Sequence, residues 1–350
     1  MTVSVRRTAV PLTALALVTA AVAGCAGPGG DTPRAGASPA APSSPAASRE
    51  GPVSASPRSS VSRPPGAGDR ESSGRYATLP ASVSGRTPVF RHGPREEDRE
   101  AAREEERDGR EEREGGDERR KREDGENREK GGDRGDKVVA LTFDAVLSAE
   151  DRERAEDGER RDNPGLVAAL RREKAPATFF MTGVWAQTYE HQARSIGRDR
   201  LFEVGSLSYS HRAFTRDCGG LPALAPGEQL ADVRKGVKAI RAAGVKNLTP
   251  YFRFPGGCFD DRSRRAVGPA GVTAVESDVV APDARERNPE KVAEKVLKDV
   301  RPGSVVALDC DRKGSPATEK AVRRLVPELR ERGYRIVPVS ELIASAVGRD

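Results

Sequence analysis

Val138-Val139-Ala140-Leu141-Thr142-Phe143-Asp144 is a mostly apolar run that ends in an acid. It follows a long stretch with almost no large apolar side chains, and after it short apolar runs alternate with longer amphipathic segments. Short runs rich in β-branched and aromatic residues are typical of buried strands. The run therefore predicts the first strand of a folded domain, with Asp144 at its carboxyl end.

The alternation that follows predicts an α/β fold. Apolar runs predict strands at 138–143, 177–182, 201–205, 251–254, 272–278, 304–308 and 334–339, and amphipathic segments predict helices at 165–173, 186–196, 227–243, 289–300 and 316–332. Strands that alternate with helices favour a parallel sheet. About seven parallel strands suit a distorted, incomplete (β/α) barrel better than a Rossmann sheet, and in such barrels the functional groups lie at the carboxyl ends of the strands.

The first 25 residues resemble the signal of a bacterial lipoprotein. Arg6 and Arg7 precede an apolar stretch over about residues 9–23, and Val22-Ala23-Gly24-Cys25 closes it. The stretch is shorter than the roughly 20 residues that a membrane span needs. Lipidation at Cys25 would make the mature chain an extracytoplasmic, membrane-anchored lipoprotein of a bacterial cell. The alternative is an ordinary secretory signal with a chance cysteine.

Residues 26–136 are predicted to be a disordered tether. The segment is rich in Pro, Ser, Ala and Gly to about residue 91 and in Arg, Glu, Asp and Gly from residue 95. Such compositions bury too little apolar surface to offset the entropy of ordering the chain. A flexible chain of about 110 residues spans roughly 55 to 60 Å. One folded domain, over 137–346, is therefore expected at the end of this tether.

The charge of the chain does not indicate a nucleic-acid partner. Its net charge of +6 is a small difference between 60 basic and 54 acidic side chains that are largely mixed. Only three residues are histidine, which limits sites built on several imidazoles.

Five segments in order resemble the polysaccharide deacetylases of the NodB homology family, carbohydrate esterase family 4. They are L-T-F-D at 141–144, S-Y-S-H at 208–211, F-R-F-P-G-G at 252–257, an acid-bearing strand end at Asp278, and P-G-S-V-V-A-L-D at 302–309. The resemblance covers residues 137–343. It implies metal-assisted removal of acetyl groups from an N-acetylated polysaccharide such as peptidoglycan or a chitin-like glycan, with zinc or cobalt held by one aspartate and two histidines.

The resemblance also implies that most of the metal site has been replaced. Asp144 stands at the position of the family's catalytic base, and Ala145 stands where the metal-binding aspartate is expected. Leu207 replaces the first histidine, which leaves His211 as the remaining histidine ligand. Ala and Leu donate no electron pair, so this chain is expected to hold a divalent metal weakly or not at all.

The other family positions carry three more candidate catalytic residues. Arg253 matches the arginine that orients the base, and a structural ion pair with Asp144 is the alternative. Asp278, followed by Pro282-Asp283-Ala284, matches the fourth segment without its tryptophan. Asp309 stands where the acid histidine belongs, and it could donate a proton only if burial raised its pKa considerably. Its alternative role is that of a polar pocket residue.

The remaining histidines and cysteines concern two further candidate sites, a metal site and a disulfide. His92 and His191 are expected to face solvent, and a replacement metal site of Asp144, His211 and Asp309 stays open as an alternative. Because the histidine and arginine loops rim one face of this family's fold, a disulfide between Cys218 and Cys258 is expected, with Cys310 unpaired.

Two functions follow from these residues. The first is a cell-envelope deacetylase with a depleted metal site. The second is a catalytically inactive pseudoenzyme that binds a glycan or a partner protein.

Overall fold

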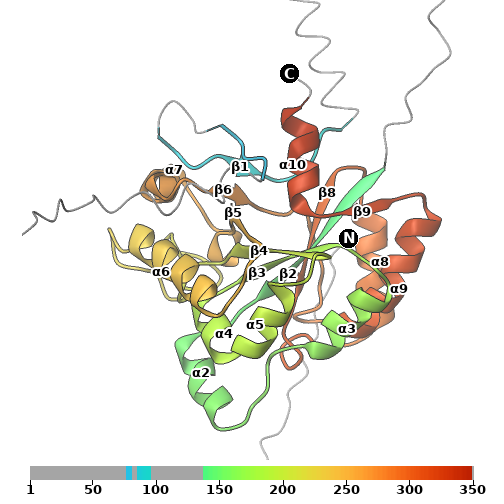
Figure 1. Ribbon diagram of the computed structural model, residues 1–350, viewed down its shortest axis with the longest axis horizontal. Coiled ribbons are helices and arrows are strands. Elements are labelled where there is room, and N and C mark those ends of the chain that lie inside the picture. Colours follow the sequence, from blue (N-terminus) through green and yellow to red (C-terminus); the bar gives the residue numbers. More distant parts are fainter. Residues whose placement is uncertain (1–75, 81–84, 96–136, 349–350) are drawn as a thin grey trace, which may run out of the picture. The chain divides into compact units, whose positions relative to one another are not determined.

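A computed structural model of the chain describes residues 76–80, 85–95 and 137–348 (Figure 1). The predicted signal, Cys25 and most of the predicted tether lie outside these residues. No helix among the described ranges has the length and apolar character that a membrane crossing needs.

The domain is built on one parallel sheet of nine strands. In spatial order these are β1 (Val89–Phe90), β6 (Thr273–Val275), β5 (Leu248–Phe252), β4 (Phe202–Ser206), β3 (Ala177–Met181), β2 (Val138–Ala145), β8 (Ser304–Asp309) and β7 (Val279–Val280), and β9 (Arg335–Val337) pairs with the start of β2. The sheet curls into an incomplete barrel, which confirms the predicted fold class. It has more strands than the seven expected because β1 and β7 are only two residues long, too short to give a sequence pattern.

Strand β5 begins earlier than its sequence pattern indicates. The sequence predicts this strand over 251–254, whereas β5 runs from Leu248 to Phe252 and includes Pro250, which donates no hydrogen bond to a sheet. The sheet register shifts in this region, between the pairs that Val204 and Ser206 make with β5. Pro250 lies between these two pairs, where the regular ladder is interrupted.

Nine helices are present in the part of the chain that the structure describes. They are α2 (Ala149–Glu156), α3 (Pro164–Arg172), α4 (Gly183–Thr188), α5 (Glu190–Ile196), α6 (Gln229–Ala242), α7 (Asp261–Val267), α8 (Pro289–Asp299), α9 (Thr318–Glu331) and α10 (Val339–Val347). The helix expected over 186–196 is interrupted at Tyr189, whose backbone is not helical (φ −112°, ψ 48°). Helix α2 buries none of its side chains and so gives no apolar period in the sequence.

Local capping fixes where two of these helices begin. The side chain of Asn163 accepts a hydrogen bond from the Leu166 N–H, and Pro164 occupies the first helical position of α3. Asn288 and Pro289 repeat this arrangement at the start of α8. A polar cap followed by proline is a strong start signal because proline lacks a donor that would be unsatisfied there.

Two apolar layers hold the sheet. The outer layer includes Phe143, Phe179 and Trp185. Helices α3, α4, α5, α8 and α9 contribute to this layer, and Figure 1 shows them beside the sheet. The inner layer lies within the curve of the sheet and contains Phe180, Leu207 and side chains of α10. Helix α10 contacts β2 and follows β9, which pairs with the first residues of β2. The inner layer is therefore covered by α10 at the amino-terminal ends of the strands, and the candidate site lies at their carboxyl ends.

Residues 76–80 and 85–95, called here the N-terminal strap, pack on the domain although the sequence placed them in the tether. Strand β1 within this strap pairs with the edge strand β6, and Phe90 is buried in the inner layer. The Leu79 N–H donates to Thr273 Oγ1 (3.2 Å), and the Gly93 N–H donates to the Gly303 carbonyl (2.7 Å). The structure differs from the prediction because a few apolar side chains suffice to cover an otherwise unpaired sheet edge.

His92 also lies in this strap, and it is half-buried, whereas the sequence predicts that it faces solvent. It forms an isolated antiparallel bridge with Ser304, and its ring nitrogen Nδ1 lies 2.9 Å from the Gly93 carbonyl. His92 is therefore more buried than predicted, whereas His191 on α5 is exposed as expected.

Candidate functional site at the carboxyl ends of the strands

Asp144 and Asp309 are neighbours across strands β2 and β8. They are paired in the parallel register, and each is partly exposed. Paired residues of adjacent strands project to the same face of a sheet. The two carboxylates therefore lie on one face at the carboxyl ends of their strands.

Arg253 holds Asp144 from the side of β5. Its side chain is only 4% exposed, and its Nη1 lies 2.7 Å from Asp144 Oδ1. Nε donates to the Val275 carbonyl (3.0 Å), and the guanidinium lies 4.2 Å from the centre of the Phe180 ring. Nη2 is buried without a hydrogen-bond partner. The expected contact between Arg253 and Asp144 is thus present, and the Nη2 nitrogen of the arginine is left without a hydrogen-bond partner.

Asp309 is held from the opposite side, by the segments that follow β7 and β8. Its Oδ2 accepts from Ser315 Oγ (2.8 Å), and its backbone N–H donates to Asp283 Oδ2 (2.9 Å). Asp283 Oδ2 also accepts from Thr318 Oγ1 (2.6 Å). Burial raises the pKa of Asp309 to about 7, and the negative charges of Asp283 and Asp144 add to this. Burial likewise raises the pKa of Asp283.

His211 lies on the loop after β4 in a left-handed backbone conformation (φ 58°). Its N–H donates to Ser208 Oγ (3.2 Å), and the N–H groups of Tyr209 and Ser210 donate to Asp232 Oδ2 (3.0 and 3.3 Å). Burial lowers the pKa of His211, although the charge of Asp144 opposes the shift. The imidazole is therefore neutral at pH 7 and retains one nitrogen that can accept a hydrogen bond.

The residues at the family's metal positions do not fit a divalent metal. Leu207 is 1% exposed and packs in the inner layer with Phe180 and Tyr251, and Ala145 is fully buried. A catalytic zinc normally takes three protein ligands. Within the described ranges, no group of three His, Cys, Asp or Glu side chains is arranged to hold a metal, so the trio of Asp144, His211 and Asp309 does not form such a group either.

Asp278 does not lie at this site, and its prediction as a catalytic residue is wrong. Its carboxylate accepts from the Val305 N–H (2.7 Å) and from Ser304 Oγ (2.8 Å), at the start of β8. Asp309 ends the same strand five residues later, roughly 17 Å away along an extended chain. Asp278 instead pairs with Arg95 of the N-terminal strap.

Glu276 is a site residue that the sequence analysis missed. It directly follows β6 and is 6% exposed, and its Oε1 accepts from the Phe254 N–H (3.1 Å). Burial raises the pKa of Glu276 to about 7, although the charge of nearby Arg253 opposes the shift. The available signal is an acid at the end of a strand, but the resemblance points to Asp278, two residues later.

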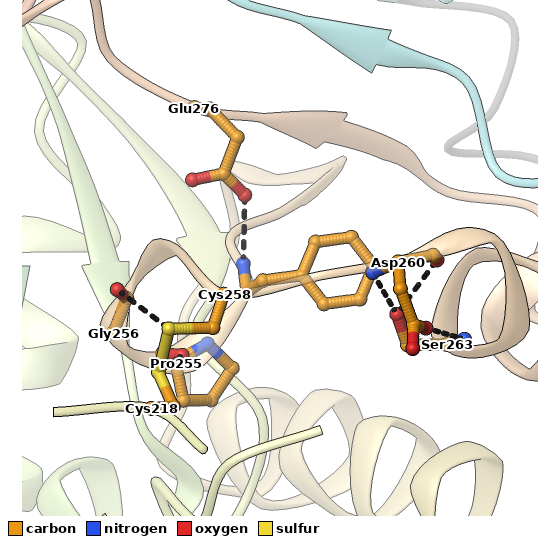
Figure 2. The surroundings of a disulfide bond; sticks show 8 residues. Cys218, Pro255, Gly256, Cys258, Asp260, Ser263 and Glu276 are labelled. Carbon is orange, nitrogen blue, oxygen red and sulfur yellow. Dashed lines mark hydrogen bonds between the residues drawn. A yellow bond between two sulfur atoms is a disulfide. The ribbon is translucent and has the colours of Figure 1, made fainter. Parts of the chain in front are cut away.

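A disulfide joins the two loops that carry His211 and Arg253. Figure 2 shows the bond between Cys218 and Cys258 beside Pro255 and Gly256, and this is the pairing predicted from the sequence. A Cβ atom at Gly256 would lie 2.5 Å from Cys218 Sγ, and Gly256 also has a positive φ of 67°, so only glycine fits there. Cys310 is unpaired and buried, and burial raises the pKa of its thiol.

The chain is similar in sequence to known polysaccharide deacetylases. The family model described as polysaccharide deacetylase matches residues 131–275. The chain is 27% identical over 212 residues to the peptidoglycan-N-acetylglucosamine deacetylase of Bacillus cereus, covering 59% of this chain and 89% of that protein. It is 26% identical over 190 residues to a chitooligosaccharide deacetylase of Bradyrhizobium, covering 51% and 83%.

Among solved structures, one similar chain is a carbohydrate esterase family 4 pseudoenzyme from Bacillus anthracis. The identity is 23% and the TM-score 0.49, and the match covers 60% of this chain and 66% of that one. The family model and the curated relatives carry the assignment: this chain contains a polysaccharide deacetylase domain.

Proposed function

We propose that this domain binds an N-acetylated glycan and does not perform the family's metal-assisted hydrolysis. The observation that carries the proposal is the burial of Leu207 and Ala145 at the two positions where metal ligands are expected. Neither side chain offers a lone pair, and Leu207 is part of the inner apolar layer. A rotamer change therefore cannot restore the missing ligands.

Binding is supported by the polar groups that remain at the site. Asp144 accepts a hydrogen bond from Arg253 and Asp309 accepts one from Ser315, and the His211 N–H donates to Ser208 within its own loop. An ordered set of donors and acceptors at a partly exposed strand edge is suited to a polar ligand such as a sugar. The curated relatives are named for peptidoglycan N-acetylglucosamine and chitooligosaccharides, which makes N-acetylated glycans the ligand class to test first.

The proposal includes a place at the cell envelope. If Cys25 is lipidated as the sequence predicts, the domain is held outside the cytoplasm beside the membrane, where peptidoglycan is the accessible N-acetylated polymer. Cys25 lies outside the described residues, so this part rests on the sequence pattern alone.

A second candidate is a deacetylase with residual activity. The observation that favours it is the raised pKa of Asp309, since a carboxyl with a pKa of about 7 is partly protonated at neutral pH and could serve as an acid.

Acetate release and binding, measured on the same sample, separate the two. The purified chain is incubated with acetylated chito-oligosaccharide or peptidoglycan, with and without zinc or cobalt, and binding is measured by calorimetry. We expect binding without acetate release. Release that exceeds that of an Asp144→Ala variant would favour the second candidate, and absence of binding to either glycan would overturn the proposal.

A further inference from the structure

We infer that Asp309 determines specificity for the acetamido group: its carboxyl donates a hydrogen bond to the amide carbonyl, while the carboxylate of Asp144 accepts from the amide N–H. The inference rests on the proposed glycan binding and names the groups that recognise the ligand. In this arrangement Asp309 binds the carbonyl oxygen, a contact that a metal ion would otherwise make.

The position of the two side chains suits an amide. Asp144 and Asp309 are register partners on adjacent strands, and both are partly exposed to a ligand. Arg253 draws Asp144 toward β5, whereas Ser315 holds Asp309 on the opposite side. A trans secondary amide presents its N–H and its carbonyl on opposite sides, so a donor and an acceptor held apart in this way can bracket it.

The two acids differ in the charge that faces them. Arg253 supplies a positive charge to Asp144, which suits an acceptor. Three acids face Asp309. Asp283 comes from the β7–α8 segment, Asp144 from β2, and Asp311 from the loop that follows Asp309 itself. This surrounding charge and the burial both favour the neutral carboxyl, whose O–H can donate. Glu276 and His211 are the other titratable groups of the site, and Glu276 also has a pKa of about 7.

A direct test measures how affinity depends on pH. The full chain is titrated with N-acetylated chitotetraose at pH 6.0 and pH 8.5 by calorimetry. The affinity of the wild type is expected to fall by about 30-fold, following the protonated fraction of an acid with a pKa near 7. Asp309→Asn keeps an N–H donor at every pH, so its binding should persist at pH 8.5 with the pH dependence lost. Asp309→Ala should lose binding at both pH values.

Two control variants separate Asp309 from other titrating groups. Glu276→Gln should keep the fall in affinity, because it removes the other acid with a pKa near 7 but leaves Asp309 intact. Glu294→Gln, on the exposed side of α8, should behave as the wild type. Circular dichroism at both pH values verifies that each variant is folded.

The possible results separate the role of Asp309 from the proposed glycan binding. Binding that is independent of pH, or that survives in a folded Asp309→Ala variant, would overturn the role of Asp309 and leave glycan binding in place. A pH dependence that persists in Asp309→Asn would also overturn it. No binding at any pH would overturn the proposed function and the inference together.

Discussion

The hydroxyl of Tyr251 donates a hydrogen bond of 2.7 Å to the carbonyl of Ala77, a residue 174 positions earlier in the chain. The ring of Tyr76 packs against the same tyrosine, with the ring centres 6.4 Å apart. Tyr251 belongs to β5 and is buried in the inner layer. The N-terminal strap is therefore part of the domain's core, which begins well before the family resemblance at residue 137.

Removing the packing of the strap should destabilise the domain. Phe90 is 4% exposed, and we expect Phe90→Ala to lower the free energy of unfolding by about 3 kcal/mol because it leaves a cavity in the inner layer. Urea denaturation of the full chain measures this. Val280→Ala is the matched control, since Val280 is 67% exposed and its truncation should change stability by less than about 0.5 kcal/mol. Equal unfolding midpoints for both variants would show that the strap is not packed.

The disulfide should stabilise the fold through the loop that it closes. Cys218 and Cys258 are separated by 40 residues, and a closed loop of that size restricts the unfolded chain by about 4 kcal/mol. A Cys218→Ser, Cys258→Ser double variant should therefore unfold at a clearly lower urea concentration than the oxidised wild type. Reduction of the wild type should bring it to the midpoint of the double variant. A midpoint that reduction does not move would contradict the bond.

Stability should fall as the pH rises toward neutral because of Glu276. Burial raises its pKa from an ordinary 4.5 to about 7 in the folded state. Between these two values the folded chain binds more protons than the unfolded chain, so raising the pH removes stability in that window. Glu276→Gln should flatten the slope of unfolding free energy between pH 5 and pH 7, measured by urea titration, and its Oε1 can still accept from the Phe254 N–H. A slope that is unchanged in this variant would place the responsible proton elsewhere, with Asp309 the next group to test.

Restoring the two ligand types should create metal affinity at a cost in stability. An Ala145→Asp, Leu207→His double variant places a carboxylate and an imidazole where the family carries them, beside the retained His211. We expect chelator-sensitive retention of about one zinc per chain in the double variant and much less in the wild type, measured by elemental analysis after dialysis. Without metal the variant should be less stable by roughly 1 to 3 kcal/mol, since a polar ring enters the apolar layer around Leu207. The single Leu207→His variant is the control. If the wild type bound zinc equally well, the expected loss of metal affinity in this chain would be refuted.

The parallel sheet could be predicted because strong local patterns encode it. The run of 177–182 gives β3 (Ala177–Met181) almost to the residue, since all of its positions are buried and apolar or small. The contact between Arg253 and Asp144 was also expected, because the family resemblance implies that this arginine orients the base.

Other features depend on tertiary structure that a sequence pattern does not carry. Val89 and Phe90 pair with β6 although two apolar residues in a polar stretch have no period. After β6 the chain turns back and brings Asp278 beside Val305. The sequence does not show this turn, so it does not reveal that Glu276 and not Asp278 lies at the site. The raised pKa of Asp309 likewise depends on Asp283 and Asp144, which only the fold brings close.

The backbone contacts of Gly303 bring together the two parts of the chain that flank the charged residues 96–136. Gly303 accepts from the Gly93 N–H (2.7 Å) and donates to the Val138 carbonyl (2.8 Å), so the chain leaves and re-enters the domain beside one glycine. The residues that flank this segment are therefore held close together, so its length does not set the distance between the domain and the residues before Tyr76. Lengthening or shortening it should leave the spacing from Cys25 unchanged, which only the residues before the strap can set.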